Sequence, residues 1–130
     1  MIVLDASVVL EVLLRLPRAR GIETRIFAAG ESLHVPHLLD IEVAQVLRRY
    51  ARMGDADPAD CADALLDLSA FPLTRHPHGL LMERVWDLRD NLTAYDAVYV
   101  ALAEALDAPL LTRDRRLANA PGTSATIELV

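Results

Sequence analysis

The segment that decides the fold of this chain is IVLDASVVLEVLL, residues 2–14. Its first part, Ile2 to Asp5, is short, apolar and rich in β-formers, and it predicts a strand that ends in an acid. Ser7 to Leu14 follow at once and are apolar almost all round, which predicts a buried helix. A strand that leads directly into a buried helix is typical of a parallel sheet covered by helices.

The remaining sequence repeats this alternation. Further strands are predicted at residues 32–35, 72–75, 109–112 and 126–130, and further helices at 22–29, 37–53, 58–70, 80–89, 93–106 and 115–120. Residues 17–21 break the pattern between the first two helices. No repeat or linker divides the chain, so we expect one domain over residues 1–130. The pattern predicts an α/β fold with a short, mostly parallel central sheet flanked by helices.

Composition is that of a folded protein, with 53% hydrophobic and 25% charged residues. The single cysteine, Cys61, allows no internal disulfide and fits a reducing cytoplasm. The apolar N-terminus lacks a basic start and is interrupted by Asp5 and Glu11, so we do not expect a signal peptide. No run approaches the ~20 apolar residues of a membrane span. We therefore expect a cytoplasmic protein without a membrane anchor.

The formal net charge is −6, and all 13 basic residues are arginine. A negative charge argues mildly against a binder of nucleic acid that relies on a basic surface. The argument weakens if several carboxylates hold a cation, because the metal reverses their local sign. The absence of lysine excludes Walker A phosphate binding and Schiff-base chemistry.

Glu42 is the most informative acid in the sequence. The predicted helix over residues 37–53 has one apolar face, made by Leu38, Leu39, Val43, Val46, Tyr50 and Met53. Glu42 falls within that face, whereas Asp40 and Arg48 lie on the opposite side. A carboxylate on a buried face costs several kcal/mol unless something compensates it. The sequence leaves two compensations open, an ion pair with Arg49 or a bound metal ion.

Three other acids occupy strand ends or helix starts, where each has a structural explanation. Asp5 and Asp114 suit N-caps, and Asp96 completes a variant of the capping box that begins at Thr93. Ligands of open parallel sheets lie beyond the carboxyl ends of the strands, which puts Asp5 and Asp114 on one rim. The helix over residues 93–106 is apolar on all sides except Glu104, so we expect it to be central. Four carboxylates gathered together would select a hard cation, Mg²⁺ or Mn²⁺.

Three segments have the order and spacing of a known family. They are IVLDAS at residues 2–7, LTAYDAVYVALAE at 92–104 and LTRDRRL at 111–117, with Glu42 on the helix between the first two. Together they resemble the PIN domain and, more narrowly, the VapC toxins of bacterial toxin–antitoxin pairs. The resemblance covers essentially the whole chain. Its most specific parts are the helix start at residues 95–97 and the Thr112-x-Asp114 segment.

The resemblance implies a PIN-like three-layer fold and a Mg²⁺- or Mn²⁺-dependent endoribonuclease, the toxin of a type II pair that inhibits growth by cleaving RNA. The residues that match the family's catalytic and metal-binding quartet are Asp5, Glu42, Asp96 and Asp114. Ser7 and Thr112 match small polar residues that support the quartet, and no acid of the four is substituted. In such enzymes the metal activates a water and clamps the scissile phosphate.

The resemblance also implies partners. Arg113, Arg115 and Arg116 would contact the RNA substrate, and a small VapB-type antitoxin would cover the site. A homodimer is expected as well. The apolar residues in excess of one buried face, which suit either protein surface, are Leu13, Leu14, Leu16 and Ile41.

Three other classes of protein or site are compatible with parts of this sequence. A phosphatase or receiver-like domain would need a lysine and an Asp-x-Asp after the first strand, where this chain has Asp-Ala-Ser. A zinc site would draw on His34, His37, His76 and His78, which share no common helix and have no cysteine beside them. The alternative kept beside the nuclease is a non-catalytic PIN-like module that binds RNA or a partner.

Overall fold

The computed structural model describes all 130 residues and centres on a sheet of five parallel strands in the order β3-β2-β1-β4-β5. The strands are β1 (Ile2–Leu4), β2 (Leu33–Pro36), β3 (Leu73–His76), β4 (Leu110–Thr112) and β5 (Ile127–Leu129). Each lies within two residues of a predicted strand. The α/β class with a parallel central sheet is therefore confirmed.

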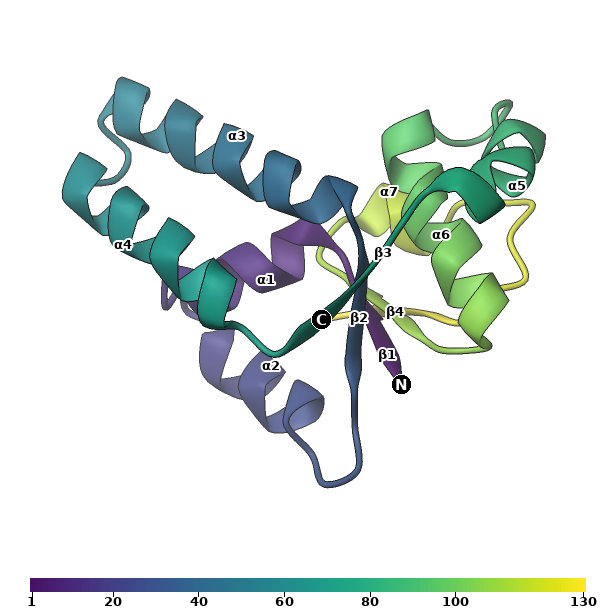
Figure 1. Cartoon of the computed structure of the whole chain (residues 1–130), viewed down its shortest axis with the longest axis horizontal. Coiled ribbons are helices and arrows are strands. Elements are labelled where there is room, and N and C mark those ends of the chain that lie inside the picture. Colours follow the sequence, from purple (N-terminus) through teal and green to yellow (C-terminus); the bar gives the residue numbers. More distant parts are fainter.

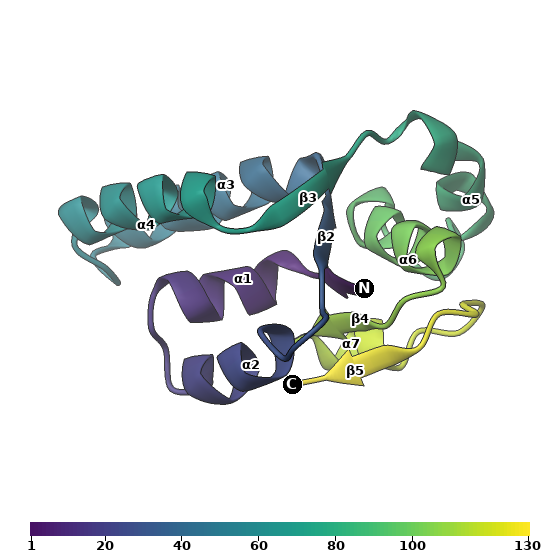
Figure 2. The same ribbon diagram turned by 60° about the horizontal axis from the view of Figure 1, so that its bottom comes forward.

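The helices are α1 (Ala6–Leu13), α2 (Ala19–Ile26), α3 (Leu38–Met53), α4 (Pro58–Ala70), α5 (Met82–Asp87), α6 (Ala94–Leu106) and α7 (Arg115–Ala118). Helices α1 to α4 lie on one side of the sheet and α5 and α6 on the other (Figures 1 and 2). The antiparallel pair of α3 and α4 extends well beyond the sheet (Figure 1). No helix is both long enough and apolar enough to cross a membrane.

Two predicted helices differ from those observed. Helix α2 begins at Ala19, so the break predicted at residues 17–21 is shorter, because Arg15 turns the chain in a left-handed conformation (φ 53°). The helix predicted over residues 80–89 is a 3₁₀ turn, η1 (Gly79–Leu81), followed by the short α5. The chain from Leu88 to Asn91 then closes in turns rather than continuing the helix.

Several helix ends follow the chemistry of the sequence. Gly54 ends α3 with φ 76°, a conformation that only glycine adopts at low cost. Asp57 caps α4 by accepting a hydrogen bond from the Ala59 amide, with Pro58 in the first turn. Thr93 caps α6 by accepting from the Asp96 amide. The Thr93 cap fixes where α6 begins, and Asp96 lies in the first turn of that helix.

The core extends over both faces of the sheet, and β1 and α6 are among its most buried elements. All three residues of β1 are fully buried, and every residue of α6 from Ala97 to Ala103 is buried. The prediction that residues 93–106 form the central helix is confirmed. Helix α6 packs on β1 and β2. Its first turn lies at the carboxyl ends of the strands, since Asp96 in that turn is near enough to Asp5 and Asp114 to feel their charges.

Candidate functional site

Asp5 follows β1 directly, and its carboxylate is held by two hydroxyl groups. Ser7 Oγ donates to Asp5 Oδ2 at 2.7 Å, and Thr112 Oγ1 donates to the same oxygen at 2.8 Å. Asp5 occupies the N-cap position of α1, but its side chain makes no capping hydrogen bond. The carboxylate is therefore oriented by side chains from α1 and β4 rather than used to start a helix, and it is only 8% exposed.

Asp114 follows β4 and lies on the same rim. Its amide donates to Thr112 Oγ1 at 3.0 Å, so one hydroxyl connects Asp5 and Asp114. The predicted cap is also present, because Asp114 Oδ1 accepts from the Arg116 amide at 2.8 Å. Oδ1 thus caps the N-terminus of α7, and Oδ2 lies 3.7 Å from Nη2 of the Arg116 guanidinium.

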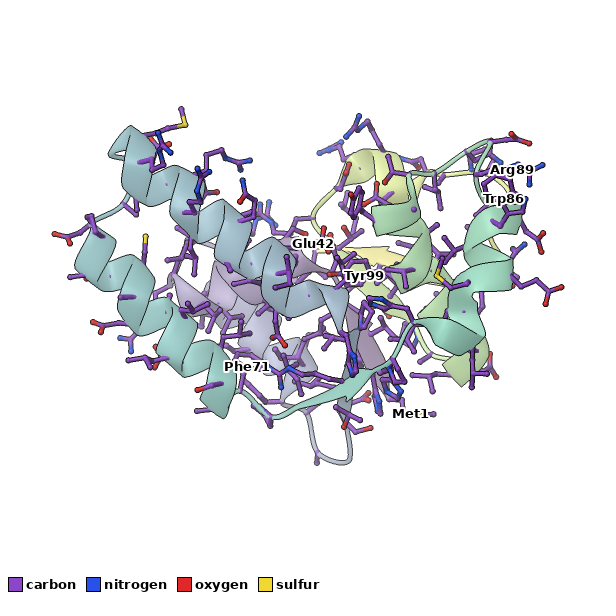
Figure 3. All side chains as sticks on the ribbon, turned by 45° about the horizontal axis from the view of Figure 1, so that its top comes forward. Met1, Glu42, Phe71, Trp86, Arg89 and Tyr99 are labelled. Carbon is purple, nitrogen blue, oxygen red and sulfur yellow. The ribbon has the colours of Figure 1, made fainter.

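Glu42 is half-buried on α3 and accepts a hydrogen bond from Tyr99 of α6. The phenol oxygen lies 2.5 Å from Glu42 Oε1, and the two side chains meet across the site in Figure 3. Burial raises the pKa of Glu42 above its ordinary value, although the Tyr99 hydrogen bond opposes this, and Asp5 and Asp96 add repulsion. The pKa of Tyr99 is raised far above its ordinary value by burial and by Glu42.

Two details of the predicted α3 face were wrong. Met53, which was predicted to be buried, is exposed, and Leu47, which was not predicted, is buried with Leu39 and Val43. Glu42 therefore lies at the edge of the buried face rather than within it. The ion pair considered between Glu42 and Arg49 is not formed. The Arg49 guanidinium instead lies over the Tyr50 ring, 5.7 Å from its centre.

Asp96 lies in the first turn of α6, half-buried beside the other acids. Its amide donates to Thr93 Oγ1 at 3.2 Å, which is one half of the predicted capping box. The pKa of Asp96 is raised first by burial, then by the charges of Asp5 and Asp114. The four predicted acids therefore lie near enough to repel one another, and no arginine forms an ion pair with Glu42 or Asp96.

A cleft of about 660 Å³ opens over this rim. Its polar and charged lining residues include Asp5, Ser7, Glu11, Glu42, Gln45, Arg49, Tyr95, Arg113 and Asp114. The wall beside them is apolar, with Leu38, Ile41 and Val46 from α3. As their side chains are oriented, no three acids or histidines form a group able to hold a metal ion.

Of the three arginines predicted to contact substrate, Arg113 alone lines the cleft. Its guanidinium pairs with Glu11, which is 2% exposed, and its amide donates to Ser7 Oγ at 3.0 Å. Arg115 is exposed on α7, and the Arg116 side chain is 92% exposed. Neither lines the cleft.

Glu11 and Tyr99 were not among the predicted site residues. Glu11 interrupts an otherwise apolar helix, which is the signal that marked Glu42, and it could have been found in the same way. Tyr99 lies three residues after Asp96, on the same side of α6. Its contact with Glu42, 57 residues away in sequence, has no local signal.

Three of the four histidines use ring nitrogens in hydrogen bonds to other groups of the protein. His34 Nδ1 and His76 Nε2 are hydrogen-bonded at 2.9 Å, and His34 Nε2 pairs with the Ser32 hydroxyl at 2.8 Å. His78 Nε2 accepts from the Leu38 amide at 3.0 Å. These contacts join β2, β3 and the start of α3, and they do not form the zinc site considered from the sequence.

The sequence over most of the chain matches one known family. A family model, described as PIN domain, matches residues 2–122. The chain therefore belongs to the PIN-domain family.

Within that family, the chain is similar to mycobacterial ribonucleases. It is 45% identical to ribonuclease VapC9 of Mycobacterium tuberculosis over all of this chain and 98% of that protein. It is 36% identical to ribonuclease VapC12 of the same organism, over all of this chain and 99% of the relative. Similarity at this level over the full length places the chain in the VapC group.

Solved structures agree in fold. PAE2754 from Pyrobaculum aerophilum superposes with a TM-score of 0.70 and 26% identity, over 97% of this chain and 81% of that one. VapBC2 from Rickettsia felis, bound to a DNA fragment from its promoter, gives a TM-score of 0.71 at 14% identity, over 99% and 98% of the two chains. The second likeness concerns the fold alone.

Proposed function

We propose that this protein is a Mg²⁺- or Mn²⁺-dependent endoribonuclease and the toxin of a type II toxin–antitoxin pair. The observation that carries the proposal is the group of four carboxylates at the carboxyl ends of the strands. Asp5, Glu42 and Asp114 line one cleft, and burial together with the charges of neighbouring acids raises the pKa of Glu42 and of Asp96, neither of which forms an ion pair. The ribonuclease names of the VapC relatives support RNA as the substrate.

The chemistry of the donor set fits a hard divalent cation. All four candidate ligands are carboxylates, and magnesium and manganese prefer such oxygen donors. A cation would also offset the repulsion that raises the pKa of Glu42 and Asp96. The side chains would have to turn to form the coordination shell, since they do not converge as they stand.

The residues around the cleft would divide the work of phosphodiester hydrolysis. A bound cation would supply an activated water and charge for the phosphate. Ser7 and Thr112 would hold the Asp5 carboxylate in position, because both hydroxyls donate to its Oδ2. Tyr99 would aim Glu42 into the cleft. Arg113 would donate to the RNA phosphate, since it lines the cleft beside the acids.

The experiment that tests this proposal is cleavage of RNA with Mg²⁺, Mn²⁺ or EDTA, comparing wild type with Asp5→Asn and Asp96→Asn. We expect cleavage only with a divalent cation, and a loss of at least about a hundredfold in each variant, as for removal of an essential group. Equal behaviour of all three proteins with either metal would instead favour the non-catalytic module.

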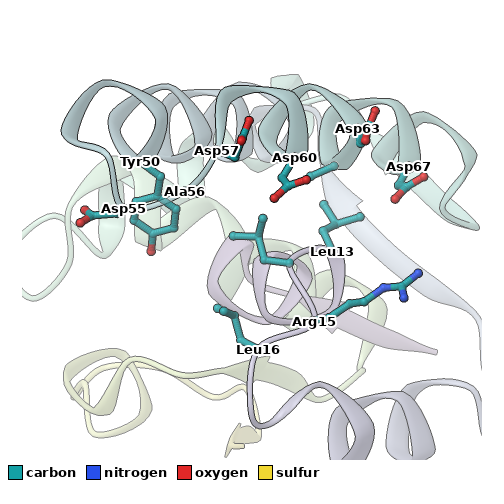
Figure 4. Close-up of a pocket in the computed structure, with 12 residues that line it drawn as sticks. Leu13, Arg15, Leu16, Tyr50, Asp55, Ala56, Asp57, Asp60, Asp63 and Asp67 are labelled. Atoms are coloured by element: carbon teal, nitrogen blue, oxygen red, sulfur yellow. The ribbon is translucent and has the colours of Figure 1, made fainter.

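A VapB-type antitoxin is the proposed protein partner, and a groove beside the site supports it. The groove, of about 950 Å³, lies between the end of α1 and the α3–α4 pair. Figure 4 shows Asp60, Asp63 and Asp67 along α4 above Leu13. A segment with both apolar and basic residues would fit these walls. Asp60→Asn combined with Asp63→Asn should weaken antitoxin binding, measured by calorimetry, and unchanged affinity would argue against this groove.

A homodimer and a cytoplasmic location complete the proposal. Ile41 is 69% exposed on α3 and Leu16 is 38% exposed after α1, so both remain available as apolar contacts. We expect light scattering of the purified chain to give twice the monomer mass. The matched variant Ile41→Ser should be a monomer if Ile41 lies in the dimer interface. A wild-type chain that is a monomer at all concentrations would count against the dimer.

A further inference from the structure

Glu11 is the most deeply buried charged residue of this chain, and the proposed reaction gives it no role. It lies in the middle of α1, an otherwise apolar helix, and is 2% exposed. Its two oxygens are both used. Oε1 accepts from the Arg18 amide at 2.7 Å, at the start of α2, and Oε2 accepts from Arg113 Nη1.

The pair is difficult to explain by stability alone. A buried ion pair gains little over well-packed apolar residues of similar size, because removing both charges from water is costly. Leucine or valine fills the neighbouring positions of α1, so an apolar residue at position 11 would be an ordinary choice. The carboxylate is therefore better explained by what it holds.

What it holds is the guanidinium of Arg113, at the cleft. The Arg113 side chain is 36% exposed, and Nη1 is its only nitrogen with an acceptor in the protein. The Nε and Nη2 donors remain free for a ligand. Arginine presents such donors in a fixed fork that matches two oxygens of a phosphate.

Arg113 is also fixed at its other end. Its amide donates to Ser7 Oγ, and that hydroxyl donates to Asp5. The backbone of Arg113 is thus connected to the first acid of the quartet, and its guanidinium is connected to Glu11. A side chain held at both ends loses little freedom when it binds, which is the basis of preorganisation.

We propose that Glu11 is a positioning residue that holds Arg113 in the orientation that binds an RNA phosphate beside the acidic quartet. This inference rests on the proposed ribonuclease function, because it assigns a substrate contact to the same cleft. It distinguishes Arg113 from Arg115 and Arg116, which have no comparable partner and do not line the cleft.

Net charge alone and this proposal predict opposite effects of Glu11→Gln on RNA affinity. Removing a negative charge from an acidic cleft should strengthen the binding of a polyanion if Glu11 acts only through its charge. If Glu11 positions Arg113, Glu11→Gln should weaken binding. The isosteric amide keeps an acceptor for the Arg18 amide but no longer holds the guanidinium as a carboxylate does.

The experiment uses the full chain carrying Asp96→Asn, so that RNA stays intact, with a labelled mixed-sequence single-stranded RNA in Mg²⁺. We expect Glu11→Gln to raise Kd roughly fivefold to tenfold, the size expected for one weakened charge-assisted contact. The matched control is Glu83→Gln, an exposed acid on α5, which should leave Kd unchanged. A Kd that is unchanged or lower in Glu11→Gln would overturn the inference.

Two further variants separate positioning from a purely structural role. Arg113→Lys keeps the charge but loses the fork, and it should also raise Kd. Arg113→Gln should lower the slope of log Kd against log salt by about 0.7, the loss of one phosphate contact on single-stranded RNA. The double variant Glu11→Gln/Arg113→Gln should bind no more weakly than Arg113→Gln alone, and additive losses would contradict the proposal.

Folding and function are checked separately. Circular dichroism and thermal midpoints identify variants that fail to fold. If Glu11→Gln does, Glu11→Asp replaces it: the shorter side chain keeps the charge but withdraws it from Arg113, so Kd should rise, and an unchanged Kd would overturn the inference. If the wild-type protein does not cleave RNA, the proposed function is refuted. If Glu11→Gln leaves the RNA affinity unchanged, only this inference is refuted. If the Asp96→Asn protein binds no RNA while wild type cleaves it, the inference also fails.

Discussion

Tyr99→Phe removes one oxygen that the structure places 2.5 Å from Glu42 Oε1. A hydrogen bond to a charged group contributes about 1.5–3 kcal/mol. Glu42 is half-buried, so water can replace part of the lost contact, and we expect the lower end of that range, about 1.5–2 kcal/mol. For a chain of this length such a loss lowers the thermal midpoint by about 5–8 °C.

The assay is urea and thermal denaturation at neutral pH in EDTA, which removes any contribution of a divalent cation. Tyr50→Phe is the matched control, since Tyr50 is partly buried on α3 and its hydroxyl makes no hydrogen bond in the protein. In a Glu42→Gln background the cost of Tyr99→Phe should shrink, because the acceptor is no longer charged. If Tyr99→Phe matches wild type, or costs the same in both backgrounds, the Tyr99–Glu42 contact does not have the strength that we assign.

Asp96→Asn should raise the free energy of unfolding at neutral pH in EDTA. The pKa of Asp96 is raised in the folded state, so the ionised carboxylate destabilises the fold once the pH exceeds the ordinary pKa of an aspartate. A lower free energy of unfolding in urea titrations would contradict this. Glu104→Gln should destabilise by roughly 1–2 kcal/mol at neutral pH after allowance for solvent screening, since Arg84 holds the pKa of Glu104 at about 2. That difference should disappear as pH falls from the ordinary value toward 2, and a constant difference in calorimetric scans would exclude the ion pair as its source. Gly54→Ala should cost about 1 kcal/mol, because Gly54 has φ 76°, and an unchanged melting temperature would show that the end of α3 relaxes.

The order of elements could be predicted because local signals specify it. Short apolar runs that end in an acid or a proline, each followed by a helical pattern, are sufficient for a parallel sheet with helices on both faces. That topology puts Asp5 and Asp114 on one rim, and the structure connects them through Thr112. The predicted boundaries were wrong at the start of α2, where Arg15 turns the chain before Pro17, and after α5, where the turn contains neither proline nor glycine.

The contacts that orient the site could not be predicted, because they join residues that are distant in sequence. A helical wheel places Glu42 near Arg49 but says nothing of Tyr99, which arrives from α6. Glu11 and Arg113 are 102 residues apart and meet only because β1 and β4 are neighbours in the sheet. Sequence therefore identified which acids are unusual, and packing decided what each one contacts.

The central claim is that the four carboxylates hold a divalent cation. The most direct measurement is a calorimetric titration of Mn²⁺ into the metal-free wild type and into Glu42→Gln, with Glu83→Gln as a control for the loss of one charge. We predict saturable binding to wild type and to Glu83→Gln, and at least about a tenfold weaker affinity for Glu42→Gln, as for loss of one ligand or its partner. Absence of saturable binding to wild type, or equal affinity in all three proteins, would contradict the account.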